Sequence, residues 1–304
     1  MISLIKILKE IYINEGGNVF KNTEFDTEDI LLANIAPTIK KFTEDLGTLF
    51  PNKKNTFAAL NNKSNWLGST GNKPQSGDVD LAYSEEVFFK NGTIDINGWG
   101  ISETDYTPLY EKNKKAARTA TDEQIQLKSV IQLIVNKINN SGGEMKASDK
   151  ASGAGSIHLS YPQYDLSGKK LDIRAQLDLD IGDMDWLKFR FNSDLPKEDP
   201  NIKGLHRGQL MLAMFSALGY TFKSGRGFVR KETGETIADK PEGAMEVFNQ
   251  EYQPKLPLTL DIINSYNKLI DYVNNNLKPE DKSKTLDMFR EALRRAGAYV
   301  PENI

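Results

Sequence analysis

Two aspartates separated by a single residue are the feature of this 304-residue sequence with the most evident chemistry. Asp78 and Asp80 lie in residues 78–82, where polar and apolar side chains alternate, and this alternation predicts a β-strand. In a strand, residues i and i+2 point to the same face about 7 Å apart, so the two carboxylates would lie side by side. Such carboxylates repel each other unless cations neutralise them, which predicts a divalent metal site.

The residues that precede this pair are suited to binding phosphate. Gly68 and Ser69 predict a small turn upstream of Asp78. Glycine lets backbone amides approach phosphate oxygens closely, and the hydroxyls of Ser69 and Ser76 can donate further hydrogen bonds. A turn of this kind beside two carboxylates predicts a site for phosphate groups next to the metal.

A third carboxylate is expected from a neighbouring strand. In-line displacement at phosphorus uses two metal ions about 3.5–4 Å apart, one activating the attacking oxygen and one holding the triphosphate. Residues 171–181 predict such a strand, and alternation places Gln176, Asp178 and Asp180 on one face. On spacing alone, either aspartate can serve as the third ligand.

Composition narrows the choice of metal. The chain has no cysteine and only two histidines, His158 and His206. Oxygen atoms must therefore supply most of the ligands, which favours magnesium, manganese or calcium. His158 lies in a run of alternating polarity, and we expect an exposed or hydrogen-bonded structural role for it.

Hydropathy and charge define a broad class. With 38% hydrophobic and 27% charged residues the chain is typical of a globular protein. No run is long enough to cross a bilayer, and residues 1–12 have helical spacing unlike a signal peptide. We therefore expect no membrane partner and a cytoplasmic location. The net charge of -3 neither requires nor excludes nucleic acid.

Periodicity and turn residues outline the elements that must position these side chains. Residues 84–121 form a polar insertion for which no structure is predicted. The strands are expected over residues 78–82, 143–150, 156–161 and 171–181, with a hairpin over 223–230. The helices are expected over residues 1–12, 27–49, 121–138, 203–218, 258–277 and 280–297.

The order of these motifs resembles that of the DNA polymerase beta superfamily of nucleotidyltransferases. The likeness is strongest to the palm and thumb of family X DNA polymerases, over about residues 60–255. It rests on Gly68-Ser69, on Ser76-Gly77-Asp78-Val79-Asp80 and on Ala175-Gln176-Leu177-Asp178-Leu179. The resemblance implies an α/β (α+β) fold with a mixed or antiparallel sheet. Its expected parts are an N-terminal helical segment (1–60), a palm (61–195), a thumb-like subdomain (196–255) and C-terminal helices (256–304).

The resemblance also implies roles for individual residues. Asp178 is preferred over Asp180 as the third catalytic acid, and with Asp78 and Asp80 it would bind Mg²⁺ or Mn²⁺. The nucleotide would further contact Lys73, Gly77, Phe189 and Phe191, although the residues themselves favour a place in the core for the two phenylalanines. The sequence departs from the family before the third acid, where Ala175-Gln176 replaces basic residues. Members of the family also carry an asparagine and an arginine on the first helix of the thumb. This sequence has no counterpart of them unless His206 or Arg207 substitutes.

The activity that this resemblance implies is transfer of a nucleotide to a 3'-hydroxyl of DNA or RNA, with release of pyrophosphate. The candidate contacts to the nucleic-acid backbone are Lys223, Arg226, Arg230 and Lys231, and a solvated basic hairpin is the alternative for them. Two other functions are open. The acceptor can be a hydroxyl of a protein or small molecule, or the chain can be a catalytically silent binding protein of the same fold.

Overall fold

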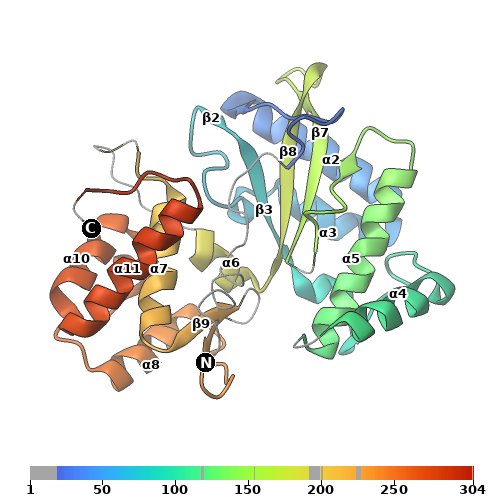
Figure 1. The fold of residues 1–304 in the computed structure, drawn as a ribbon. Helices are drawn as coiled ribbons and strands as arrows, with labels where there is room; N and C mark the ends of the chain where they lie inside the picture. The colour runs from blue at the N-terminus through green and yellow to red at the C-terminus, as the bar shows by residue number, and fades with distance from the viewer. Residues whose placement is uncertain are drawn as a thin grey trace. The chain divides into compact units, whose positions relative to one another are not determined.

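The computed structural model describes residues 19–117, 120–153, 155–191, 199, 201–223, 227–302 and 304. The helix expected over residues 1–12 and the candidate Arg226 lie outside these residues. The described chain forms two compact units, one within Gly16–Met184 and the other within Asp185–Ile304. We call them the sheet unit and the helical unit. Figure 1 shows the elements of both.

The sheet unit is built on a mixed four-stranded sheet, which makes this an α/β fold with both parallel and antiparallel pairing (Figure 1). Strand β3 (Asp78–Ser84) runs parallel to β8 (Lys170–Gly182), which is central. Strand β7 (Ser156–Tyr164) pairs antiparallel with β8 on its other side, and the short β6 (Lys146–Ala147) pairs with β7. The strand expected over residues 143–150 is thus reduced to two residues.

One face of this sheet is apolar and forms the core of the sheet unit. Helix α2 (Leu32–Leu49) packs on this side against β7, and α5 (Asp122–Asn140) contributes its own apolar stripe. Thr121 caps α5 through a reciprocal capping box with Gln124, which fixes where the helix begins. The sheet contributes alternate residues to this core, among them Val79, Leu81, Ile157, Leu159, Leu177 and Leu179.

A short strand pair connects the N-terminal segment with the start of β3. Strand β1 (Ile30–Leu31) pairs antiparallel with β2 (Gln75–Ser76). This pairing holds the backbone extended, so the helix expected from residue 27 begins only at Leu32. Four short helices connect the remaining elements of this region: Pro51–Lys53, Lys54–Ala58 (α3), Ala59–Asn61 and Lys63–Asn65.

The described part of the insertion after β3 contains a helix. A 3₁₀ helix (Glu85–Phe88) leads into the β4–β5 hairpin, formed by Phe89–Lys90 and Thr93–Ile94. Helix α4 (Glu103–Ala116) follows and packs against α5. Sequence periodicity does not reveal α4, because only Tyr106 and Asn113 of its residues are buried.

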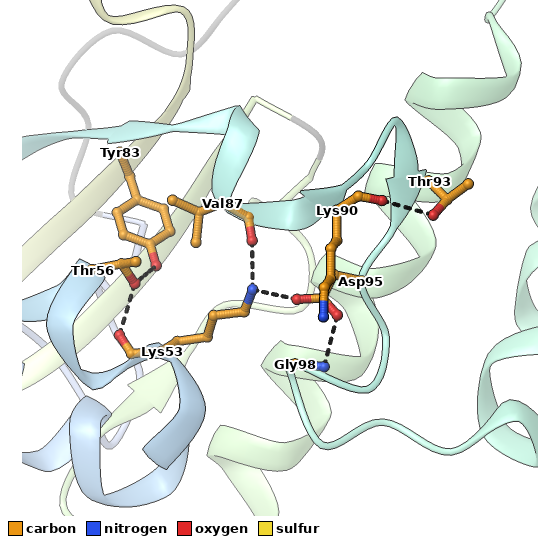
Figure 2. Close-up of polar contacts among 8 residues, drawn as sticks. All are labelled: Lys53, Thr56, Tyr83, Val87, Lys90, Thr93, Asp95 and Gly98. Atoms are coloured by element: carbon orange, nitrogen blue, oxygen red, sulfur yellow. Dashed lines mark hydrogen bonds and ion pairs between the residues drawn. The ribbon is translucent and has the colours of Figure 1, made fainter.

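A buried ion pair fastens this insertion to the body of the sheet unit (Figure 2). Lys53 Nζ lies 2.7 Å from Asp95 Oδ2 and donates a 2.8 Å hydrogen bond to the Val87 carbonyl. The two side chains are only 11% and 16% exposed. Burial alone would raise the pKa of Asp95, but the hydrogen bonds from Lys53 and from the Gly98 amide lower it overall. The Asp95 carboxyl therefore stays ionised at neutral pH.

The helical unit has a core of its own, centred on α7 (Gly204–Ala217). Most residues of α7 are buried, and helices α10 (Tyr266–Asn276) and α11 (Pro279–Arg295) pack against it. The helix expected over residues 258–277 divides at Ser265, whose extended backbone and side chain cap the second helix. The elements of the unit are α6 (Met184–Phe191), α7, β9 (Tyr220–Lys223), β10 (Gly227–Arg230), α8 (Pro241–Tyr252), α9 (Leu260–Asn264), α10 (Tyr266–Asn276) and α11 (Pro279–Arg295). None of the described helices in either unit is long and apolar enough to cross a membrane.

Candidate metal and nucleotide site

Three aspartates meet on the polar face of the sheet. Asp78 and Asp80 project from β3, and Asp178 projects from the neighbouring β8. One carboxylate oxygen of each lies within 4.8 Å of the other two. Asp178 is buried, while Asp78 and Asp80 are half-buried. Sequence analysis proposed these same three residues as metal ligands.

The strand register decides which acid of β8 joins the pair. In the parallel pairing of β3 with β8, Asp80 lies directly opposite Asp178, whereas Asp180 lies opposite Ala82. Spacing alone left the choice between Asp178 and Asp180 open. The choice follows from the way the two strands align, which brings Asp178 level with the aspartate pair.

Asp178 lies close enough to Asp78 to affect the ionisation of the Asp78 carboxyl. Burial first, and then the negative charge of Asp178, raise the pKa of Asp78 to about 6. Lys73 and His158 act in the opposite direction, but their positive charges only partly offset the rise. We call the three aspartates the acidic group. The positive charge near Asp78 does not balance the negative charge of this group, as expected for a site that is completed by a cation.

The donor set fits Mg²⁺ or Mn²⁺. All three side chains offer carboxylate oxygens, the ligands that these hard cations prefer. The three carboxylate oxygens already lie within 4.8 Å of one another. Small displacements of the side chains would bring them around a common ion. The identity of the metal stays a prediction.

A tight loop, residues 68–77, lies beside the aspartates and is fastened to β3. The Leu67 amide donates to the Asp80 carbonyl at 2.9 Å, and the Asp80 amide donates to Thr70 Oγ1 at 2.9 Å. Gly68 has φ of 56°, in the left-handed region that glycine adopts without strain. Among the described residues, the amides of Gly68 and Ser69 have no hydrogen-bond acceptor. They are available to a ligand such as a phosphate.

The other loop residues proposed as nucleotide contacts differ in their accessibility. Ser76 is buried, and its hydroxyl donates to the Ser69 carbonyl at 3.4 Å, so it supports the loop from within. Lys73 and Gly77 are exposed. Lys73 is near enough to Asp78 to lower the pKa of that carboxyl, which places its charge beside the acidic group.

Phe189 and Phe191 belong to α6 of the helical unit. Phe189 is buried against the rings of Trp186 and Phe228. It also borders a cavity of about 600 Å³, whose lining includes Lys188 and Lys240. Phe189 is therefore part of the core, the place that its residue type favoured. Phe191 is half-buried beneath the Arg190 guanidinium.

The basic residues proposed to contact nucleic acid are only partly available. Lys223 is exposed on β9. Arg230 forms ion pairs with Glu251 and Glu235. Lys231 Nζ donates to the carbonyl and hydroxyl of Ser216, near the C-terminal end of α7. Arg226 lies outside the described residues.

The two residues considered as replacements for a family arginine are occupied within the fold. His206 Nδ1 accepts from the Lys203 amide, and its Nε2 lies 2.8 Å from the Tyr299 carbonyl. Arg207 is fully buried and donates to the carbonyls of Phe189, Arg190 and Ile263. Both side chains therefore have structural roles.

Sequence reasoning did not identify three residues that contact the aspartates. Thr70 binds the backbone of Asp80, while Gln176 and His158 contact the Asp178 carboxylate. Alternation along β8 already placed Gln176 on the same face as Asp178. Nothing local in the sequence indicated His158, because its position depends on the register of β7 against β8.

We compared the chain with models of known protein families and with curated proteins, and neither comparison finds a match.

Proposed function

We propose that this chain is a metal-dependent nucleotidyltransferase with a polymerase beta-like palm. One observation carries the proposal: carboxylate oxygens of Asp78, Asp80 and Asp178 lie within 4.8 Å of one another. The loop of residues 68–77 beside them offers free amides in its glycine turn. Clustered carboxylates next to such a turn are the arrangement that phosphoryl and nucleotidyl transfer requires.

In the proposed reaction, a hydroxyl attacks the α-phosphorus of a nucleoside triphosphate, a bond to the acceptor oxygen forms and pyrophosphate leaves. Asp78 and Asp80 would hold both metal ions, and Asp178 the ion on the side of the nucleophile. The bound Mg²⁺ or Mn²⁺ would supply positive charge to the triphosphate and favour ionisation of the attacking hydroxyl. The amides of Gly68 and Ser69 would donate hydrogen bonds to phosphate oxygens, and Lys73 would add its charge.

The acceptor that we propose first is a 3'-hydroxyl of DNA or RNA. A specific observation favours a second candidate, transfer to a hydroxyl of a protein or small molecule. Arg230 and Lys231 were the proposed backbone contacts, yet their charged groups are bonded to Glu251 and Ser216 inside the helical unit. These bonds reduce the positive charge that is free to follow a nucleic-acid strand.

The test is incubation of the protein with Mg²⁺ or Mn²⁺, each labelled nucleoside triphosphate, and single-stranded, primed or gapped DNA or RNA. Extended oligonucleotides would support the first acceptor, and label on protein or on a small hydroxyl compound would support the second. Asp78→Asn and Asp178→Asn should lower the rate by about three orders of magnitude. Full activity in Asp78→Asn would refute the site.

Asp172→Asn is a matched control for these variants. Asp172 lies on β8 in the same alternation as Asp178, but it is exposed near the start of the strand. We therefore expect Asp172→Asn to keep wild-type activity. If the wild-type protein labels no acceptor, the chain would instead be a silent binding protein of this fold.

A further inference from the structure

Both oxygens of the Asp178 carboxylate are contacted by side chains from the same face of the sheet. Gln176 Nε2 donates to Oδ2 at 2.9 Å, and His158 Nδ1 lies 2.9 Å from Oδ1. Asp178 itself is only 6% exposed. Its carboxylate is therefore fixed at both oxygens in a place where water has little access.

The position of His158 is set by the sheet. In the antiparallel pairing of β7 with β8, His158 lies directly opposite Asp178. The ring is held from its other side by Ser156, whose Oγ lies 3.0 Å from His158 Nε2. Nδ1 thus faces the Asp178 carboxylate, and Nε2 faces the Ser156 hydroxyl. Polar contacts at both nitrogens restrict the orientation of the ring.

Gln176 is fixed in a comparable way. Its amide group is buried, and its Oε1 accepts a 3.0 Å hydrogen bond from the Val19 amide while Nε2 donates to Asp178. The Val19 contact requires the oxygen on its own side and so leaves the NH₂ group facing Asp178. This side chain also links the segment before β1 to the acidic group.

The chemical type of these two contacts matters for a metal site. Gln176 and His158 each present an N–H-bearing nitrogen to one oxygen of Asp178. Each oxygen then has a further lone pair available to a cation. Buried side chains that orient a metal-ligating carboxylate commonly raise metal affinity, and their loss costs about 10–100-fold.

We propose that His158 and Gln176 are positioning residues, which hold the Asp178 carboxylate in the orientation that binds a divalent cation. The proposal rests on the proposed function of the aspartate site, and it assigns no contact with substrate to either residue. Neither residue acts by gaining or losing a proton. Their effect is to restrict the rotation of Asp178 in the free protein.

The test is Mn²⁺ binding by titration calorimetry, which does not depend on turnover. His158→Ala and Gln176→Leu should each weaken Mn²⁺ binding by about 10–100-fold. His158→Asn places an amide NH₂ near the position of Nδ1 and should recover affinity to within about threefold of wild type. Recovery of this kind is not expected if His158 only fills space.

Two matched controls report on general damage to the fold. Gln163 is a buried glutamine of β7 whose amide binds backbone carbonyls and not Asp178, and His206 is a buried histidine of the helical unit. Gln163→Leu and His206→Ala should leave Mn²⁺ affinity unchanged, even where the melting temperature falls. Melting curves without metal identify any variant that fails to fold, and the other positioning variant then carries the test.

The outcomes separate this proposal from the proposed function. Wild-type Mn²⁺ affinity in folded His158→Ala and Gln176→Leu would overturn the positioning roles and leave the aspartate site intact. If Asp178→Asn also bound Mn²⁺ as wild type does, both proposals would fail. Loss of affinity in all three variants, with unchanged controls, would support both.

Discussion

Asp78 is the residue of the site whose ionisation the fold changes most clearly. Burial and the adjacent Asp178 carboxylate raise its pKa to about 6 from an ordinary value of 3.8. Because the folded pKa lies above the unfolded one, folding favours the protonated form. The resulting stability is present below about pH 4 and is lost as the pH rises through 6. At neutral pH the metal-free protein therefore contains an unfavourable negative charge.

Removal of this charge should stabilise the metal-free protein. At pH 8 in the presence of a chelator, we expect Asp78→Asn to increase the free energy of unfolding by about 1–3 kcal/mol, a rise of several degrees in melting temperature. At pH 4.5 the difference from wild type should nearly disappear. Thermal melts at the two pH values measure both effects.

Asp172→Asn serves as the control here too, because this exposed carboxylate lies away from the acidic group and should change stability little at either pH. Added Mn²⁺ should raise the melting temperature of the wild type at pH 8, and should raise it less at pH 5, where protons compete for Asp78. Equal stability of Asp78→Asn and wild type at pH 8 would contradict the prediction.

At the scale of elements, the loop of residues 68–77 depends on glycine at two turns. Gly71 has φ of 75°, and a Cβ added to it would lie 2.7 Å from the ring of Trp66. That ring is itself fixed, because its Nε1 donates to the Leu60 carbonyl at 3.0 Å. A side chain at position 71 must therefore displace the loop from Trp66 and, with it, from the aspartates.

Gly71→Ala should destabilise the protein more than Gly92→Ala does. Both glycines have left-handed φ, which costs alanine about 1–2 kcal/mol, but a Cβ on Gly92 meets no atom within 4 Å. The ring contact should add about 1–3 kcal/mol at position 71 only. Urea unfolding monitored by tryptophan fluorescence measures the difference. Equal losses in the two variants would show that Trp66 does not confine the loop.

The buried pair of Lys53 and Asp95 predicts a second effect at this scale. Asp95→Ala leaves the ammonium group of Lys53 without its carboxylate in a site that is 11% exposed, and we expect a loss of about 2–4 kcal/mol. Because the pKa of Asp95 is lowered, its contribution is present at neutral pH and is lost as the pH falls through the folded pKa.

Chemical unfolding at pH 7 and at acidic pH tests this prediction. Glu44→Ala is the comparison, because Glu44 pairs with Lys41 at an exposed site where little stabilisation is expected. A loss in Asp95→Ala no larger than in Glu44→Ala would indicate that the pair does not hold the insertion to the sheet unit.

At the scale of the whole molecule, each unit has a separate hydrophobic core. The core of the sheet unit draws on residues between Ile30 and Ile181, and the core of the helical unit on residues between Trp186 and Leu293. A fragment that contains its whole core is expected to fold by itself. The three aspartates and the loop beside them all belong to the sheet unit.

We therefore expect a fragment of residues 16–184 to unfold cooperatively and to bind Mn²⁺ with an affinity within about tenfold of the full chain. Circular dichroism melts and titration calorimetry measure these properties. The same fragment with Asp178→Asn should stay folded and lose the ion. A fragment without a cooperative transition would show that the sheet unit needs the rest of the chain.

Local pattern predicted much of the secondary structure. Strands β3, β7 and β8 and helices α5, α7 and α11 were expected within a few residues of where they occur, because each has clear alternation or an apolar stripe. Helix α4 was not expected, since its surface is mostly polar and its sequence has no such stripe. The predicted boundaries at residues 60, 195 and 255 stay predictions.

The sequence by itself determined that Asp78 and Asp80 share a face and that a third acid follows on a later strand, because side-chain alternation is a local property of a strand. Only the tertiary structure decided that Asp178 completes the group. That choice depends on the parallel register of β3 with β8, which is set by packing between residues far apart in the chain. The same non-local register placed His158 against Asp178.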